Sequence, residues 1–437
     1  MAAGFMPVAM GSLTEIERNF MNKLTVLVLS VVIGLLLAAG PRAAWAGALV
    51  SPAEQSIAQA NRMIEKNPKN FEAYNALALA LSRRARETSN VNYYAQAEEA
   101  LAKSFAMAPD NFDGKRTEVW LLLGKHEFAA ALQDAKILNQ KMPDDVMIYG
   151  FLTDANVELG NYREAEQAAQ WMLDLRPGNL PGLTRAAYLR ELFGDPQGAI
   201  ELMQMALDST APSEVEDAAW ILSQMGHLEL LRGRPSEAEK YLQQALTLFP
   251  GYHYALGNLA KVRIQQKRYP EAIALLEERY QAAQHAENLF DLAGALELGG
   301  RKEEAKRAFS EFEQKSLLES SRADNSNREL IFYYTDYTQQ PQKALAVAKG
   351  EFARRHDIYT LDAYAWALHA NGNDQEARKL MEAALAVGIR DAKLMRHAGE
   401  IALAAGDQSA GQKYFEEAAE LSDPQQGSGL AAKSAKP

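Results

Sequence analysis

The stretch that decides the fold runs from Gly160 to Pro177 and reads GNYREAEQAAQWMLDLRP. It begins with a glycine, which readily adopts the left-handed conformation that separates two helices. It ends with a proline, which cannot continue a helix. Between them, Ala165, Ala169 and Met172 are spaced by four and then three residues, so they share one helical face. The stretch therefore predicts a short helix with a narrow face of small residues and a defined end on each side.

The chain has 437 residues, and the same pattern returns from Ala97 to Gly411 with a spacing of 33 or 34. Two slips of five residues interrupt it, one after Ala199 and one after Ala305. A period in this range indicates a stacked array of one supersecondary unit, in which each unit buries its apolar face against its neighbours. The marker residues of the period are Ala97, Ala131, Ala165, Ala199, Ala238, Ala272, Ala305, Ala344, Ala377 and Gly411.

These units resemble the tetratricopeptide repeat family, whose members stack helix–turn–helix pairs of 34 residues. The resemblance implies an all-α fold, an α-solenoid in which antiparallel helix pairs form a right-handed superhelix. Ten units and a leading half unit fit between about residues 51 and 424. The departures are His126 where a turn glycine is expected, Pro196 and Pro235 at helix starts, and an insertion within residues 82–94.

The expected order along the chain begins with a signal peptide and ends with a polar tail. We divide the chain into residues 1–47 (signal peptide), 48–316 (a leading half unit and about seven repeats), 317–327 (linker), 328–424 (three repeats) and 425–437 (disordered tail).

The N-terminal segment has the features of a secretory signal. Lys23 precedes an apolar run over residues 24–39, and Ala44-Trp45-Ala46 then places small residues where a signal peptidase cuts. Met21 is the expected true start, since the acidic residues before it do not suit a basic leader. We therefore expect a periplasmic or secreted protein. The alternative is an inner-membrane protein anchored by residues 24–39, close to the shortest span of a bilayer.

Composition argues against several classes of function. The net charge is −11 and no basic run occurs, which disfavours nucleic-acid binding. There is no cysteine, and no two of the seven histidines are three or four residues apart. Phosphate-binding, zinc-protease and serine-hydrolase motifs are absent from the sequence. We therefore predict no catalytic residue, no cofactor and no metal, and a protein that is not an enzyme.

The family resemblance implies that the first helix of each pair lines a concave groove where peptides dock. Several large side chains are expected on that face, although some of them could be ordinary packing residues between helices. The candidates are Trp120, Tyr188, Trp220, His227, Tyr254, Lys261, Phe290, Tyr333, Tyr337, Tyr359 and Trp366.

The function expected from these features is a non-catalytic, exported scaffold or adaptor that binds proteins or extended peptides. Two alternatives stay open. One is a client-specific chaperone that assembles or matures an envelope enzyme or a cell-surface polymer system. The other is an accessory subunit that binds a small ligand in the aromatic groove. The sequence does not identify the partner or the oligomeric state.

Overall fold

The computed structural model describes residues 51–322 and 325–422, and every regular element within these ranges is helical. The all-α prediction is confirmed. The expected signal peptide and tail lie outside the described residues. Within them, no helix combines the length and apolar character needed to cross a membrane.

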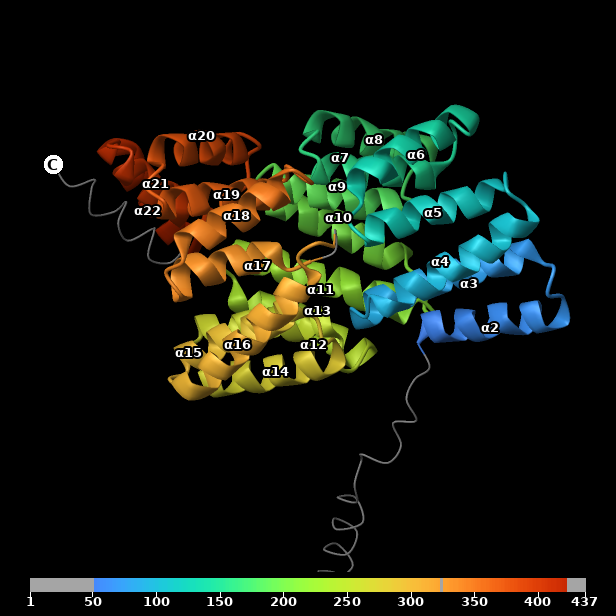
Figure 1. Ribbon diagram of the computed structural model, residues 1–437, viewed down its shortest axis with the longest axis horizontal. Helices are drawn as coiled ribbons and strands as arrows, with labels where there is room; N and C mark the ends of the chain where they lie inside the picture. Colours follow the sequence, from blue (N-terminus) through green and yellow to red (C-terminus); the bar gives the residue numbers. More distant parts are fainter. Residues whose placement is uncertain (1–50, 323–324, 423–437) are drawn as a thin grey trace, which may run out of the picture. The chain divides into compact units, whose positions relative to one another are not determined.

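The described helices form ten consecutive pairs after one leading helix (Figure 1). The first helix of the eighth pair, α17, ends at Phe332 and is followed directly by a short π-helix, η2 (Tyr333–Tyr337). The first helices of the pairs are α3 (Phe71–Thr88), α5 (Phe112–Gly124), α7 (Val146–Glu158), α9 (Leu180–Leu192), α11 (Val215–Leu231), α13 (His253–Gln265), α15 (Ala286–Leu298), α17 (Asn327–Phe332), α19 (Ile358–Ala370) and α21 (Ala392–Ala404).

The second helices begin close to each marker alanine. The leading helix is α2 (Pro52–Lys66), and the second helices are α4 (Asn92–Met107), α6 (Phe128–Lys141), α8 (Tyr162–Leu175), α10 (Pro196–Ser209), α12 (Pro235–Leu248), α14 (Tyr269–Ala282), α16 (Lys302–Glu319), α18 (Pro341–Phe352), α20 (Asp374–Leu385) and α22 (Gln408–Ser422).

The period has a direct physical cause in the packing. The nine marker alanines have no exposed surface, because paired helices approach too closely there for a larger side chain. The turns repeat as well: Gly160 has a positive φ of 75°, and His126, which replaces the glycine of its turn, has a φ of 59°. The backbone conformation of the turn is therefore kept even where the glycine is lost.

Two departures from the period lengthen particular helices. Phe71, at the start of α3, lies 26 residues before its marker Ala97, whereas Phe112 lies 19 before Ala131. The insertion makes α3 18 residues long, while α5 has 13. The first slip adds a turn to the start of α11, which has 17 residues.

These two extensions meet each other, although they lie about 130 residues apart in the chain. Arg83 Nη2 lies 2.7 Å from Glu214 Oε2. Arg86 forms an ion pair with Asp217 at 2.8 Å and a very short one with the fully buried Glu216. The backbone oxygen of Arg86 also lies 3.1 Å from His253 Nε2. The first pair thus contacts the fifth and sixth pairs directly.

A second long-range contact joins the middle pairs to the last ones. The backbone N–H of His356 donates to the oxygen of Glu158 at 2.9 Å, and that of Ile358 donates to the hydroxyl of Tyr162 at 2.9 Å. Beside them, one apolar cluster combines side chains of α7 to α9 with side chains around α19 to α21, including Leu192 and Leu394. Non-covalent contacts therefore join pairs that are distant in sequence, so that a pair does not contact only its neighbours along the chain.

The segment 317–327, expected as a linker, is partly helical and partly buried. Its first residues belong to α16, which ends at Glu319. Asn325 and Asn327 are buried, and their side-chain amides donate to Glu351 Oε2 at 3.2 and 3.0 Å. The end of this segment is thus held against α18.

Candidate binding cavity on the first helices

Three of the expected groove residues line one cavity of about 590 Å³. Trp120 comes from α5, Tyr188 from α9 and Trp220 from α11. We call this space the aromatic cavity. Its other apolar walls come from α3, α7, α9, α10 and α11, and include Leu79, Met147, Leu180, Pro181, Met203 and Ile221.

Packing behind the cavity fixes its aromatic side chains. Trp120 contacts Phe151 edge to face, with 6.0 Å between ring centroids and an interplanar angle of 88°. Tyr188 packs against the apolar cluster shared by α9 and α19, and burial raises the pKa of its hydroxyl well above the ordinary value. Side chains held in this way keep their positions when a ligand enters, which lowers the entropic cost of binding.

Arg185 crosses the cavity wall from α9 to α7. Its guanidinium donates to the backbone oxygen of Gly150 at 3.1 Å and to Asp154 Oδ2 at 2.5 Å. A Cβ at Gly150 would lie only 3.0 Å from the guanidinium carbon, so the missing side chain leaves room for this contact. The arginine is therefore tied to the protein and is not free to meet a ligand.

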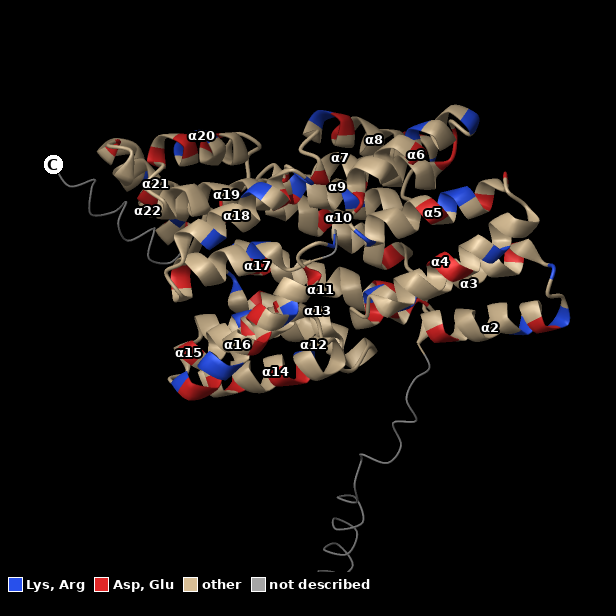
Figure 2. Cartoon of the chain, in the orientation of Figure 1, with Lys and Arg blue, Asp and Glu red and all other residues tan. Residues whose placement is uncertain are grey.

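The remaining charged groups of the cavity are also paired. Arg83 and Arg86 bind acidic residues of α11, as described above. Glu191 Oε1 lies 3.0 Å from Nε2 of His227, another expected groove residue. His227 therefore bridges α11 to α9 behind the cavity. More widely, acidic and basic residues are interspersed along the helices (Figure 2).

Tyr254 lines a smaller space of about 230 Å³, together with His253, His285 and Arg279. Burial lowers the pKa of His253 to about 4 and raises that of Tyr254 to about 12. Both groups are therefore neutral at pH 7. This second cavity shares Arg86 with the aromatic cavity, so both border the α3–α11 contact.

Other expected groove residues form an aromatic cluster towards the C-terminal pairs. Phe290 contacts Tyr337 edge to face at 6.0 Å, and Tyr337 is 43% exposed. Tyr333 departs from the expectation: it is only 7% exposed and packs on Phe309 and Phe312 in the core, where a partner cannot reach it. Tyr333 begins η2, the π-helical segment that follows α17, and Tyr337 ends it.

The last three expected residues are spread over other sites. Lys261 is exposed on α13. Tyr359 packs in the apolar cluster where α19 meets α9. Trp366 stacks on His397 with 4.1 Å between ring centroids, and its indole N–H donates to Asp336 at 2.7 Å. The expected residues therefore do not form one continuous groove.

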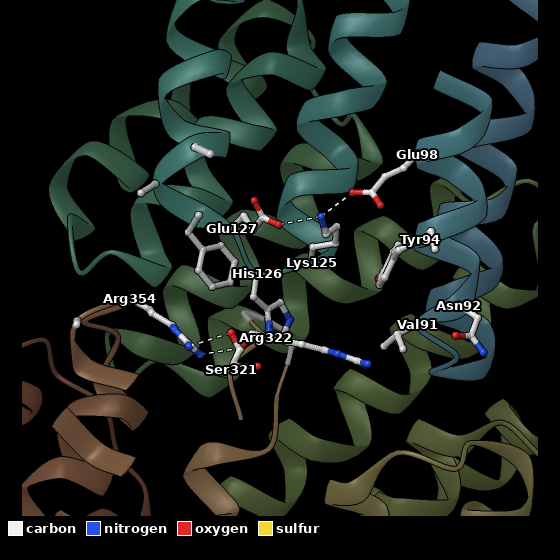
Figure 3. A pocket seen from close by; sticks show the side chains of 15 residues that line it. Val91, Asn92, Tyr94, Glu98, Lys125, His126, Glu127, Ser321, Arg322 and Arg354 are labelled. Atoms are coloured by element: carbon white, nitrogen blue, oxygen red, sulfur yellow. Dashed lines mark hydrogen bonds and ion pairs between the residues drawn. The ribbon is translucent and has the colours of Figure 1, made fainter. Parts of the chain in front are cut away.

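A further pocket of about 760 Å³ lies between α4, the α5–α6 turn and the loops around Ser321 and Arg354 (Figure 3). Lys125 points into it and is held by Glu98 at 2.6 Å and Glu127 at 2.8 Å. Arg354 donates to the backbone oxygen of Ser321 at 3.2 Å. Lys125 and Arg354 are thus engaged with protein groups, and the expected groove residues lie elsewhere. Over residues 51–322 and 325–422, no group of acidic residues and histidines is arranged to hold a metal ion.

The residues predicted from the sequence to line the groove include none from α3, although α3 contributes to the aromatic cavity. Leu79, Arg83 and Arg86 lie in the unit that carries the insertion. The insertion is visible as a break in the period, but the break does not show which distant helix the longer α3 contacts.

Comparison with known proteins agrees with this architecture. Residues 229–279, from the last turn of α11 into α14, match the family model described as tetratricopeptide repeat. No curated protein matches the chain significantly. Human IFIT1, solved as a dimer with m7Gppp-AAAA, aligns over 84% of this chain and 85% of that chain, with 14% identity and a TM-score of 0.49.

Two other solved structures cover less of the chain. PilW, described as a type IV pilus biogenesis factor, aligns over 46% of this chain and 92% of its own, with 14% identity and a TM-score of 0.40. A tetratricopeptide repeat protein from Parabacteroides merdae aligns over 56% and 91%, with 14% identity and a TM-score of 0.41. Likeness at this level says nothing of what the present chain binds.

Stacked helix pairs with a small marker residue, alanine in nine pairs and glycine in the tenth, define the class of helical-repeat solenoids, whose fold suits a protein-interaction scaffold. The match to the tetratricopeptide repeat model covers residues 229–279, at the centre of this array, and the helix pairs on either side of it repeat the same arrangement.

Proposed function

We propose that this chain is a non-catalytic, exported scaffold that binds a protein or an extended peptide on its first helices, with the aromatic cavity as the main anchor. The observation that supports the proposal is the convergence of Trp120, Tyr188 and Trp220 on one space of about 590 Å³. Buried aromatic anchors supply much of the binding energy in protein interfaces.

Export is proposed from the sequence of residues 24–46, which lie outside the described part of the structure. Sequencing the N-terminus of the protein recovered from its native host tests it: a start near Gly47 supports release, and retention of residues 24–39 contradicts it. A protein or peptide partner is favoured over nucleic acid by the net charge of −11.

Selection from a displayed library of random peptides tests the binding function. We expect selected peptides to bind the full chain and to lose binding when Trp120, Tyr188 and Trp220 are changed together to Ala. Trp171→Ala is the matched control, because Trp171 is 54% exposed on α8 and does not line the cavity. Peptides that bind the triple variant as well as the parent chain would contradict the assignment of the site.

A further inference from the structure

We infer that the aromatic cavity takes an uncharged aromatic group, carried either on a side chain of a bound partner or on a free small molecule. The inference deepens the proposed function, on which it rests, by assigning the chemistry of the group that is bound. It follows from the size of the cavity, the nature of its walls and the pairing of all its charges.

The size fits a compact organic group. Ligand cavities commonly fall between about 300 and 1,000 Å³, and this one measures about 590 Å³. One or two fused aromatic rings fill only part of such a volume, which leaves room for the chain or group that carries them. An isolated aliphatic side chain would leave most of the apolar wall in contact with water.

The walls favour rings over aliphatic chains. Trp120 and Trp220 contribute indole surfaces from α5 and α11, and Met147 and Met203 add thioethers from α7 and α10. Aromatic pairs gain attraction beyond the area they bury. Methionine sulfur likewise makes favourable contacts with rings, and its flexible side chain adapts to their outline.

The charges of the cavity disfavour an ionised ligand. Its lining contains three arginines and three acidic residues, so the formal charges of the lining cancel. Each of the six has a partner within the protein, and these pairs are Arg83 with Glu214, Arg86 with Asp217, Arg185 with Asp154, and Glu191 with His227. A charged ligand would therefore meet no side chain whose charge is left uncompensated, and its own desolvation is costly in a partly buried site.

The α3 helix makes the site distinct from an open groove. Leu79 brings an apolar side chain to the cavity from the first pair, and Arg83 and Arg86 hold that pair on α11. Residues of α3 and of α11 therefore line the same cavity, and the cavity depends on the contact between these two helices.

Two fluorescent probes with the same ring system test the inference on the full chain. N-phenyl-1-naphthylamine is neutral, and 1-anilinonaphthalene-8-sulfonate adds one negative charge. We expect the neutral probe to bind at one site roughly tenfold or more tightly than the sulfonate, since the latter must be desolvated without a free counter-charge. Equal or tighter binding of the sulfonate would overturn the inference.

Two variants locate the probe. Gln224→Trp places a large side chain at a half-buried lining position of α11, and Trp220→Ala removes one ring. Each should weaken the neutral probe at least severalfold while circular dichroism and the unfolding midpoint stay close to those of the parent chain. Trp171→Ala should leave binding unchanged. Probe binding that survives both cavity variants would also overturn the inference.

Competition between the neutral probe and selected peptides shows whether the ring belongs to a partner chain or to a small molecule. The same experiments distinguish failure of this inference from failure of the proposed function. Displacement of the neutral probe by a library-selected peptide indicates a ring on a partner chain, whereas probe binding without competition indicates a free small molecule. If the probe binds as expected but no peptide depends on Trp120, Tyr188 and Trp220, the scaffold function fails and the aromatic site stands. If such peptides exist but the probe pair does not discriminate, only this inference fails.

Discussion

At the residue scale, turn positions show how a repeat tolerates the loss of its glycine. Gly300 has a positive φ of 76° and nothing near the position of a Cβ, so only its backbone conformation requires glycine. Lys267 occupies the corresponding turn after α13 with a φ of 58°. A side chain in this conformation costs about 1 kcal/mol, which the rest of the fold offsets.

This comparison predicts opposite effects for two reciprocal substitutions. Lys267→Gly should stabilise the chain by about 1 kcal/mol or less, because the left-handed conformation is no longer strained. Gly300→Ala should destabilise it by about the same amount, although its methyl group meets no atom. Urea unfolding midpoints of the two variants measure the effect, and shifts of the same sign would contradict it.

Protonation of His253, which is buried at the start of α13, should destabilise the fold. Burial, with Arg279 and His285 nearby, lowers the pKa of His253 to about 4 from an unfolded value of 6.5, while Glu287 opposes the shift. A histidine with a lowered pKa contributes full stability above pH 6.5 and loses it as the pH falls towards 4. The expected loss is about 2 kcal/mol by pH 5.

Thermal midpoints between pH 7.5 and 4.5 test this prediction. His253→Gln should flatten the profile relative to the parent chain, since the variant has no group that titrates at this position. His369→Gln serves as the control, because His369 is half-buried beside Asp374, away from α3. A profile that keeps its full slope in the His253 variant would contradict the assignment.

At the element scale, the extra turns of α3 and α11 form the contact between the first and fifth pairs. Glu216 is fully buried and also accepts a hydrogen bond from Tyr252 at 2.6 Å. Arg86 is the cation that offsets the charge of Glu216. The carboxylates of Glu216 and Asp217 hold the pKa of its guanidinium above the ordinary value. A buried acid of this kind depends on its partner more than an exposed one does.

Removal of the Arg86 side chain should therefore loosen the packing of α3 on α11. Arg86→Ala should cost about 3 kcal/mol or more, because the carboxylate of Glu216 loses its cation, and hydrogen exchange along α3 should accelerate. The paired variant Arg86→Met with Glu216→Leu should recover most of the loss, since no buried charge remains.

An exposed ion pair supplies the control for this experiment. Lys240 and Glu237 pair on the surface of α12 at 2.7 Å, so Lys240→Ala should change stability by about 0.5 kcal/mol or less. Unchanged exchange along α3 in Arg86→Ala would show that the ion pair does not hold the helix.

The sequence predicts the helices far better than the contacts between distant ones. Pro196 and Pro235 begin α10 and α12, and the nine marker alanines lie buried in the second helices, because these positions are governed by local geometry and neighbouring units. The burial of Tyr333 was not predicted, because the period does not say whether a tyrosine on a first helix faces the groove or the neighbouring helices. Nor was the contact of Arg86 with Glu216, because no periodic signal links residues about 130 positions apart.

At the scale of the whole molecule, the last pairs support the middle ones. Tyr162 accepts the N–H of Ile358, and Leu192 shares an apolar cluster with Ile389 and Leu394. Gly194 and Gly388 approach so closely that a Cβ on Gly194 would collide with the backbone oxygen of Gly388. In an ordinary repeat array, the stability of a unit depends only on its neighbours along the chain. These contacts make the stability of the middle pairs depend also on residues about 200 positions away.

Truncation after Phe352 tests that dependence. It removes α19 to α22, and we expect the amides of α7 to α9 to exchange roughly tenfold faster or more, since their apolar cluster loses one side. Truncation after Ala404 removes only α22 of the described helices and should leave α7 to α9 protected. Equal protection in both truncated chains would contradict a supporting role for the last pairs.

The meeting of α3 with α11 also limits how this gene could have grown. Rows of repeats ordinarily gain or lose whole units by duplication or deletion, because each junction is equivalent to the next. Here an additional unit between α5 and α10 would carry Glu216 and Asp217 away from Arg86 and leave the buried carboxylate of Glu216 without its cation. The number of units in this part of the chain is therefore fixed, as it would be in a ring.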